Sequence, residues 1–120
     1  MRAILIDPFT RSISEIDTDA SLDAMYSILE VDLITVVRLN ENHAMILDDE
    51  GLLQPKITQE YFHVQGSDQP FAGRAMILGD DYGENRAATM TVPEVASLVT
   101  FLDKEKIDPE AYCGWTVTAF

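Results

Sequence analysis

Residues 33–47 read Leu-Ile-Thr-Val-Val-Arg-Leu, then Asn-Glu-Asn, then His-Ala-Met-Ile-Leu, and this stretch decides the fold class. Its first run, Leu33 to Leu39, is rich in β-branched residues, which favour strands. Asn40 to Asn42 have turn chemistry, and His43 to Leu47 form a second apolar run. We therefore expect an antiparallel hairpin over residues 33–47, ended by the acidic turn Asp48-Asp49-Glu50-Gly51.

Short segments on either side continue the antiparallel pattern. Arg2 to Ile6 is an apolar run closed by the turn-forming pair Asp7-Pro8, and residues 12–17 alternate like the second arm of a hairpin. Residues 57–64 and 74–78 also have the composition of strands. Residues 79–86 have the composition of a polar loop.

Two segments have the period of an amphipathic helix, with apolar residues at i, i+3, i+4 and i+7. These residues are Leu22, Met25, Tyr26 and Leu29 in the first segment, and Val95, Leu98, Val99 and Leu102 in the second. Asp19 or Ser21 is suited to cap the first helix, and Thr91, Pro93 and Glu94 form a start signal for the second. The expected fold is α+β, a mainly antiparallel sheet with two amphipathic helices packed on one face.

The length of 120 residues indicates a single domain, residues 1–120. Residues 105–120 are expected to form a C-terminal arm or an edge strand, and the tail packs on its own core or on another copy, as in a homo-oligomer. The single Cys113 cannot form an internal disulfide, which favours a reducing compartment. The first apolar run is too short for a signal peptide, and no segment approaches the ~20 apolar residues that span a bilayer. We expect a cytoplasmic protein, in the bacterial cytosol or in an infected host cell.

The formal net charge is −13, from 21 acidic and 8 basic residues, while apolar residues make up 47% of the chain. A chain this apolar should fold and then present a negative surface. Such a surface repels nucleic acid and anionic membrane. It attracts basic protein surfaces, including those that normally hold DNA or RNA.

The acidic residues are unevenly distributed along the sequence. No Lys or Arg lies between Arg11 and Arg38, and this stretch holds the six residues that we expect to bind a partner: Glu15, Asp17, Asp19, Asp23, Glu30 and Asp32. The first helix and its flanks would present them as a row, which Glu41, Asp48, Asp49 and Glu50 would extend. The alternative is a surface that only keeps the protein soluble.

Two segments of the chain resemble each other. Residues 43–51, His-Ala-Met-Ile-Leu-Asp-Asp-Glu-Gly, are similar to residues 74–83, Arg-Ala-Met-Ile-Leu-Gly-Asp-Asp-Tyr-Gly. Both are predicted strands that run into an acidic turn. The similarity is either a coincidence of two sheet strands or the sign of two equivalent loops that form one acidic rim.

No catalytic or metal-binding pattern stands out, and we expect no cofactor, no metal and no enzymatic activity. His43 and His63 are isolated from each other and from Cys113, and residues 80–91 do not have the ligand spacing of a calcium-binding loop. A second hypothesis is a small anionic ligand, such as a nucleotide, held by four residues around the 79–86 loop. These residues are Arg74, Asn85, Arg86 and Thr89.

Residues 1–80 resemble a family of small, functionally uncharacterised proteins from bacteria, plasmids and phages. The resemblance lies in Arg2 to Pro8, Ile13 with Glu15-Ile16, Ala44 to Leu47 with Asp49 to Leu53, and Phe71 to Gly79. The resemblance implies that the protein comes from a mobile element, but it does not indicate any activity. The tail after Lys104 lies outside the resemblance.

The first hypothesis is therefore a non-enzymatic acidic binding protein of a mobile element, which mimics nucleic acid and inhibits a host defence nuclease. The alternatives are a protein that binds or sequesters a nucleotide and, least supported, a metal-dependent enzyme that uses carboxylates.

Overall fold

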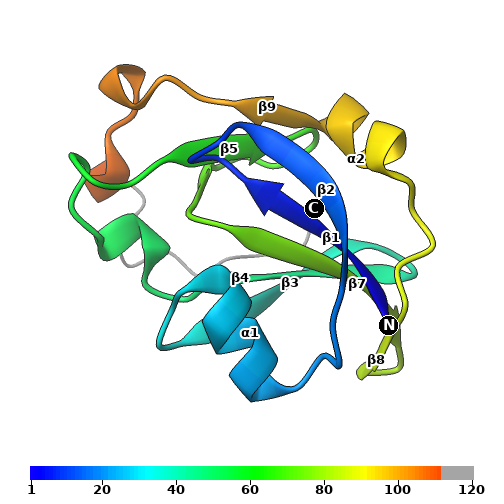
Figure 1. Cartoon of the computed structure of the whole chain (residues 1–120). Helices are drawn as coiled ribbons and strands as arrows, with labels where there is room; N and C mark the ends of the chain where they lie inside the picture. Colours follow the sequence, from blue (N-terminus) through cyan, green and yellow to red (C-terminus); the bar gives the residue numbers. More distant parts are fainter. Residues whose placement is uncertain (112–120) are drawn as a thin grey trace.

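The computed structural model describes residues 1–111, and the expected contributions of Cys113, Tyr112, Trp115 and Phe120 lie outside these residues. The described chain contains two sheets, two α-helices and three 3₁₀ turns (Figure 1). In chain order the elements are β1 (Arg2–Asp7), β2 (Ser12–Asp17), α1 (Leu22–Leu29), β3 (Ile34–Asn40), β4 (His43–Asp48), η1 (Gly51–Leu53), β5 (Tyr61–Val64), β6 (Phe71–Ala72), β7 (Ala75–Asp81), β8 (Glu84–Arg86), α2 (Val92–Leu98), β9 (Val99–Phe101), η2 (Lys104–Lys106) and η3 (Pro109–Ala111).

The large sheet has the strand order β2-β1-β7-β4-β3, with β8 paired to β7, and all of its pairs are antiparallel. Both predicted hairpins are confirmed: β1 pairs with β2, and β3 pairs with β4. The strand β7 lies between these hairpins and joins them. A second, three-stranded sheet has the order β6-β5-β9.

The central strands β1, β7 and β4 of the large sheet are buried on both faces. On one face Ala3, Ile46, Met76 and Leu78 pack against Met25 and Leu29 of α1. On the other face Ile4, Ile6, Met45, Leu47 and Ile77 pack against the small sheet and Val95 of α2. Successive strand residues point to opposite faces, so these two clusters lie on opposite sides of the sheet. Figure 1 shows α1 below the sheet and α2 with β9 above it.

The structure thus has the expected mainly antiparallel sheets with two helices, but it does not confirm that both helices pack on one face. Each helix belongs to a different cluster, because the small sheet and α2 together fill the face that α1 leaves open. The predicted apolar stripe of α1 is also incomplete, since Leu22 is 56% exposed.

The helix starts follow the sequence signals. The Ser21 hydroxyl accepts a hydrogen bond from the Ala24 N–H at 3.1 Å. Thr91 and Glu94 form a capping box, in which each side chain accepts from the other's backbone N–H. Both caps satisfy backbone N–H groups in the first turn of their helix.

Three predicted boundaries are wrong. The second helix ends at Leu98, and Val99–Phe101 pair with β5 because their alternation also suits a strand. Residues 79–86 form a β-hairpin, with β7 continuing to Asp81 and Tyr82-Gly83 at the turn. Both turn residues have positive φ, as in the two-residue turn whose twist matches that of the flanking strands. The strand predicted over 57–64 begins only at Tyr61.

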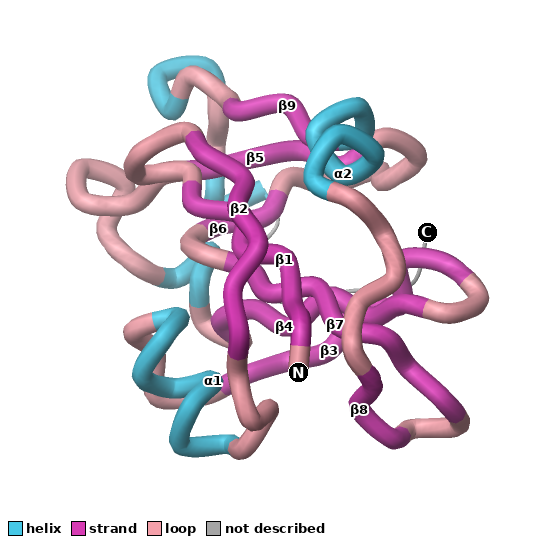
Figure 2. Tube along the Cα trace, turned by 45° about the vertical axis from the view of Figure 1, so that its right-hand side comes forward, coloured by secondary structure: helices cyan, strands magenta, loops and turns pink. Residues whose placement is uncertain are grey.

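Figure 2 shows the β7–β8 hairpin extending from the lower right of the molecule, away from α1. The strands β4 and β7, which carry the two similar sequence segments, are direct antiparallel neighbours, with His43 opposite Gly79 and Leu47 opposite Ala75. Their acidic turns therefore lie at opposite ends of the sheet. This excludes the alternative of one acidic rim and leaves the other, a coincidence of two sheet strands.

Candidate acidic binding site

The structure separates the six acidic residues predicted to bind a partner. Glu15 and Asp17 lie on β2, Asp23 lies in the first turn of α1, and Glu30 caps the end of α1. Asp19 lies in the loop before α1, and Asp32 in the loop after it. The six residues thus lie on a strand, a helix and two loops, and the contacts of Glu15 set it apart from the residues around α1.

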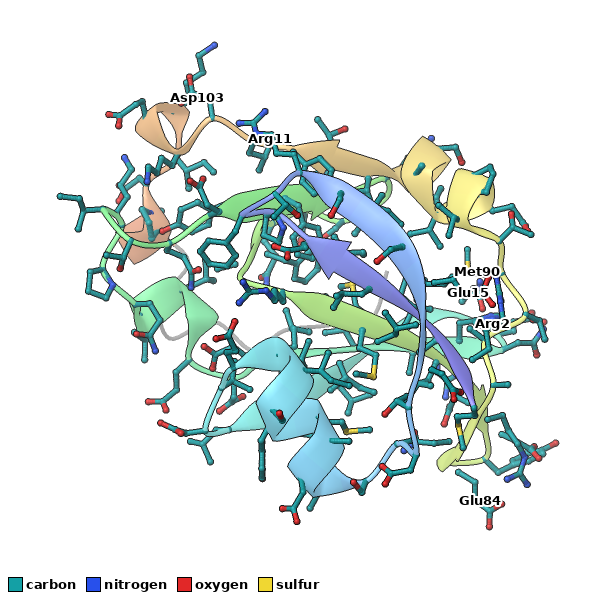
Figure 3. All side chains as sticks on the ribbon, viewed as in Figure 1. Arg2, Arg11, Glu15, Glu84, Met90 and Asp103 are labelled. Carbon is teal, nitrogen blue, oxygen red and sulfur yellow. The ribbon has the colours of Figure 1, made fainter. Side chains whose placement is uncertain are left out.

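Glu15 belongs to the face of the sheet that α2 covers. Its carboxylate forms an ion pair with Arg2 Nε at 2.8 Å. Arg2 Nη1 also donates to the carbonyl oxygens of Ala88 and Met90, both at 2.7 Å. Figure 3 shows Arg2, Glu15 and Met90 together beside the segment that enters α2. Glu15 thus orients an arginine that holds the 88–90 segment against β1, and its charge is compensated.

Asp17 and Asp19 have local partners. The N-terminal ammonium of Met1 lies 3.0 Å from Asp17 Oδ1, although the Asp17 side chain is 91% exposed. Asp19 Oδ1 accepts a hydrogen bond from the Ser21 N–H at 2.9 Å. That backbone hydrogen bond, with one from the Ser21 side chain, holds the pKa of Asp19 below its ordinary value. Asp19 therefore stays ionised at the start of α1.

A polar cavity of about 310 Å³ opens where α1 ends. Glu30 has a left-handed backbone (φ 57°), and its N–H donates to Tyr26 O, so that the chain turns sharply toward β3. The cavity is lined by four carboxylates and one guanidinium: Glu30, Asp32, Asp48, Glu50 and Arg74. The hairpin register brings these groups together, because Asp48 at the end of β4 pairs with Ile34, two residues after Asp32.

Arg74 is the one basic residue among the described residues that line this cavity. Its Nη1 lies 2.6 Å from Glu30 Oε2, and its Nε donates to Asp7 Oδ2 at 3.3 Å. The guanidinium carbon also lies 4.7 Å from the centroid of the Phe9 ring, a cation–π distance. Arg74 is thus held by Asp7, Glu30 and Phe9, which leaves Asp32, Asp48 and Glu50 without a basic partner in this cavity.

The pKa of Asp48 reflects this excess of negative charge. Burial raises the pKa of Asp48 above its ordinary value, and the neighbouring carboxylates of Asp49 and Asp32 raise it further. A hydrogen bond from the Glu50 N–H to Asp48 Oδ1, at 2.9 Å, partly opposes the rise. Such a site gains stability from a cation brought into it.

The acidic turn at the other end of the β4–β7 pair differs, because arginines compensate the charge of its carboxylates. Arg38 Nη2 lies 2.8 Å from Asp80 Oδ2, and Arg86 Nη2 lies 2.7 Å from Glu84 Oε2 and 3.4 Å from Asp81 Oδ2. The three carboxylates of the hairpin are therefore all ion-paired. Figure 3 places Glu84 at the far tip of this hairpin.

A comparison with protein families gives one match, over residues 1–102, to a family described as a domain of unknown function (DUF3846). The chain belongs to this family. The comparisons with curated proteins and with solved structures found no match. The match covers all the elements from β1 to β9, and so it includes the acidic cavity and excludes η2 and η3.

Within this family domain, the four residues predicted to hold an anionic ligand are not brought together. Arg74 precedes β7, whereas Arg86 pairs with Gly79, five residues further along the strand. At ~3.3 Å per residue this separates their backbones by roughly 16 Å. Asn85 lies opposite Asp80, and the Thr89 N–H donates to His43. Within one chain the two arginines are therefore too far apart to hold one small ligand together, because residues 79–86 form a hairpin and not a loop that folds back over Arg74.

His43, which the sequence left without a role, is a buried structural residue of the domain. Its Nε2 accepts hydrogen bonds from the N–H groups of Thr89 (3.0 Å) and Met90 (3.3 Å). Its Nδ1 therefore carries the proton and donates to Asn40 Oδ1 at 3.2 Å. Burial lowers the pKa of His43, and Glu94 nearby raises it in part. The imidazole ties the 88–90 segment to the β3–β4 turn.

Within residues 1–111, no three His, Cys, Asp or Glu side chains are arranged so that they could hold a metal ion. No helix there is long and apolar enough to cross a bilayer.

Sequence reasoning offered Asp48 as an extension of the acidic row, but it did not predict that Asp32 and Asp48 line one cavity. The signal for this proximity was present, since Asp32 directly precedes the predicted 33–47 hairpin and Asp48 directly follows it. The two ends of any hairpin are neighbours, so the hairpin alone predicts that these carboxylates are close. The contributions of Glu30 and Arg74 needed the position of α1 and β7.

Proposed function

We propose that this protein is a non-enzymatic binding protein whose acidic face binds a basic surface of another protein. The acidic face consists of seven residues around α1 and the end of β4: Asp19, Asp23, Glu30, Asp32, Asp48, Asp49 and Glu50. The observation that carries the proposal is the cavity at its centre, where four carboxylates surround one arginine that is already paired.

The charge pattern favours a cationic partner group. In the cavity Asp32, Asp48 and Glu50 have no basic partner, and the raised pKa of Asp48 is relieved when a cation enters. A guanidinium or ammonium group from a partner would supply that cation. Because the surrounding acids extend along the eight residues of α1, roughly 12 Å, the face is long enough to engage several basic groups at once.

The specific form of the proposal is a nucleic-acid mimic that blocks the basic channel of a nuclease, such as a host defence nuclease met by a phage or a plasmid. A carboxylate row occupies positions that phosphates would take, and duplex DNA presents one charge per ~1.7 Å of axis. Complementary charge increases the association rate, and this increase falls with salt. The resemblance to proteins of mobile elements supports this setting.

A pair of matched charge-reversal variants tests the acidic face. In the first, Asp32, Asp49 and Glu50, all exposed, are replaced by Lys. In the control, Glu41, Asp68 and Glu105, which are also exposed and do not line the cavity, are replaced by Lys. Both variants have the same net charge, so they differ only in where the charge is changed.

The probe is an arginine-rich peptide, and its Kd is measured by fluorescence anisotropy at low and physiological salt. We expect the first variant to bind about tenfold more weakly than the control at low salt, from three lost attractions of about 0.5 kcal/mol each. If both variants lose affinity equally, the net charge drives association and the acidic face has no special role.

Inhibition of DNA cleavage tests the nuclease-inhibitor form separately. Purified nucleases with basic DNA channels are assayed on duplex DNA with the natural protein and both variants. We expect inhibition by the natural protein and the control and its loss in the first variant. If the protein binds the peptide but inhibits no nuclease, the acidic face is a binding site and its partner is not a nuclease.

A further inference from the structure

A second cavity, which we call the outer cavity, lies on the side of the small sheet that faces away from the large sheet. Its walls come from His63 of β5, the loop that joins β5 to β6, and the segment that follows β9. Phe62 and Val64 pack in the core between the two sheets, so His63 between them points to the outer side. Among the described residues, the outer cavity shares no lining residue with the acidic cavity. Figure 3 shows Asp103, which lines the outer cavity, at the top of the molecule, whereas α1 lies at the bottom.

The wall of the outer cavity contains a buried amide without a hydrogen-bond partner. Gln69 lines this cavity and is 5% exposed. Its backbone is held in place, because the Gln69 N–H and carbonyl oxygen both bond to the Ser67 hydroxyl, at 3.3 and 3.0 Å. Its side-chain amide forms no hydrogen bond with any other residue of 1–111, and it is accessible from the cavity. Buried polar groups in proteins are nearly always paired, so this amide indicates a ligand that supplies the partners.

The other walls of the outer cavity suit a flat ring. Pro70, Leu102 and Ile107 supply apolar surface. His63 Nε2 donates to the carbonyl oxygen of Ser67 at 2.8 Å, which fixes the imidazole ring in the wall. An imidazole held in this way is a surface on which a nucleic-acid base can stack. The volume of about 570 Å³ is in the range of small-molecule sites, ~300–1,000 Å³, and leaves room for more than the ring alone.

The Gln69 amide selects one edge of such a ring. A side-chain amide presents an N–H donor beside a C=O acceptor, and it forms two hydrogen bonds with an edge that carries an acceptor beside a donor. Nucleobases have edges of this kind, and side-chain amides recognise adenine in this way. The amide, the fixed imidazole and the apolar walls together favour a nucleobase over a purely apolar ligand.

The charges around the outer cavity favour a neutral ligand. Three carboxylates and one ammonium group line it, those of Asp68, Asp103, Asp108 and Lys106. This balance repels a phosphate group. Carboxylates accept hydrogen bonds from the hydroxyl groups of a sugar. Asp103 is oriented for this role, because its Oδ1 accepts from the Glu105 N–H at 3.1 Å.

We propose that the outer cavity binds a nucleoside. Gln69 pairs with the edge of the base, the base stacks on His63, and Asp103 accepts a hydrogen bond from the sugar. The outer cavity is separate from the acidic face, and it binds its ligand whether or not the acidic face binds a partner protein.

Two buried glutamines give a matched pair of variants. Gln69 and Gln59 are each 5% exposed. The Gln59 amide is satisfied, because its Nε2 donates to Gly51 O at 3.0 Å and its Oε1 accepts from the Glu60 N–H at 3.2 Å. Gln59→Leu therefore breaks two hydrogen bonds and should lower the melting temperature. Gln69→Leu breaks none among the described residues and should not lower it.

Isothermal titration calorimetry of the full chain with adenosine, guanosine, cytidine and uridine, each at up to millimolar concentration, measures binding. We expect saturable binding of at least one nucleoside. Gln69→Leu should bind it about tenfold more weakly, from two lost hydrogen bonds, whereas Gln59→Leu should bind it as the natural protein does. The proposal is overturned if none of the four nucleosides binds, or if Gln69→Leu binds with unchanged affinity.

The preference for a neutral ligand is tested in the same assay. The 5′-monophosphate of the bound nucleoside should bind about threefold more weakly than the nucleoside itself. Asp68 is exposed, so Asp68→Asn removes one charge without disturbing the core, and it should reduce this difference. Tighter binding of the monophosphate than of the nucleoside would overturn the assignment of a neutral ligand.

Discussion

The two ends of the β4–β7 pair carry nearly the same acidic sequence and have opposite electrostatics. At the β7 end Asp80, Asp81 and Glu84 are all ion-paired with Arg38 or Arg86. At the β4 end Asp32, Asp48 and Glu50 line a cavity whose one arginine is held by Asp7 and Glu30. A run of acids in a sequence therefore does not define a binding surface. The strands that surround the run decide whether its charge is compensated.

The position at which the two similar segments diverge explains the difference. Asp48 and Gly79 stand at equivalent places after the shared Ala-Met-Ile-Leu. Asp48 Oδ1 accepts from the Glu50 N–H, which ends β4 in a turn. Gly79 has no side chain, so β8 approaches closely and brings Arg86 to the carboxylates. The residue at this position, Asp48 or Gly79, thus distinguishes a turn whose acids lack a basic partner from a hairpin whose acids are ion-paired.

The largest expected effect on stability is that of replacing His43. Its imidazole ties the 88–90 segment to the β3–β4 turn, at the end of the sheet where the acids are ion-paired. In His43→Ala the N–H groups of Thr89 and Met90 lose their acceptor, that of Met90 being buried, and a cavity forms, so we expect a loss of about 2–4 kcal/mol. Chemical denaturation at pH 7.5 measures it. His63→Ala is the matched control: its half-buried ring contacts one carbonyl, Ser67 O at 2.8 Å, and should cost less. Equal costs would mean that His43 acts only by packing.

The same residue makes a pH-dependent contribution with a definite sign. The folded pKa of His43 lies below its ordinary value of 6.5, so the folded state binds fewer protons than the unfolded state near that pH. The stabilisation is complete above pH 6.5 and is lost as the pH falls through the lowered pKa. The difference in free energy of unfolding between the natural protein and His43→Ala should shrink as the pH is lowered from 7.5 to 5. A constant difference would contradict this assignment.

An intermediate effect is expected for Gly79→Ala, which tests the role of close strand approach. A Cβ atom at Gly79 would lie 2.7 Å from Ala87 O, a backbone atom that cannot rotate away. We expect a loss of about 1–3 kcal/mol from overpacking, measured by thermal and chemical unfolding. Asp48→Ala at the equivalent position removes one turn hydrogen bond and should cost about 0.5–1 kcal/mol. If Asp48→Ala is the more damaging change, the two turns differ for another reason.

The smallest expected effects on stability come from removing one charge at either end of the β4–β7 pair, and they should have opposite signs. Asp48→Asn removes a charge that burial and two carboxylates oppose, and its Oδ1 still accepts from Glu50, so the protein should become slightly more stable at pH 7. Asp80→Asn removes the partner of Arg38 and should slightly destabilise the protein, each change being below about 1 kcal/mol. Precise chemical denaturation of both variants measures the pair.

The Asp48→Asn gain should also depend on pH. Because the folded pKa of Asp48 is raised, the folded state binds more protons than the unfolded state between the two pKa values, and the natural protein loses stability as the pH rises through that window. The advantage of Asp48→Asn should therefore disappear at acidic pH. Equal signs for the two substitutions at pH 7 would remove the electrostatic distinction between the ends.

Local sequence signals predicted the parts of the fold that form between neighbours. The alternation of residues 12–17 and the β-branched run of 33–39 gave the two hairpins, and the capping residues Ser21 and Thr91 gave the helix starts. These features depend on contacts a few residues apart. Turn composition was less informative, since the acidic and glycine residues of 79–86 suit both a loop and the hairpin that forms.

Features set by distant contacts could not be predicted in the same way. The spacing of Val95, Leu98 and Val99 suits a helix, but pairing with β5 converts Val99–Phe101 into a strand. Whether the helices share a face depends on the small sheet, which competes with α1 for the core. For the site, the proximity of Asp32 and Asp48 follows from the hairpin, whereas the capture of Glu15 by Arg2 depends on the 88–90 segment.

The central place of β7 has a consequence for how the protein is made. Both N-terminal hairpins are complete once residue 48 has left the ribosome, but each leaves an apolar inner edge that only residues 75–81 can fill. Contacts of this sequence separation form slowly. During synthesis the two hairpins therefore wait for some thirty further residues as separate units, and in that interval they are most exposed to misassembly with other nascent chains.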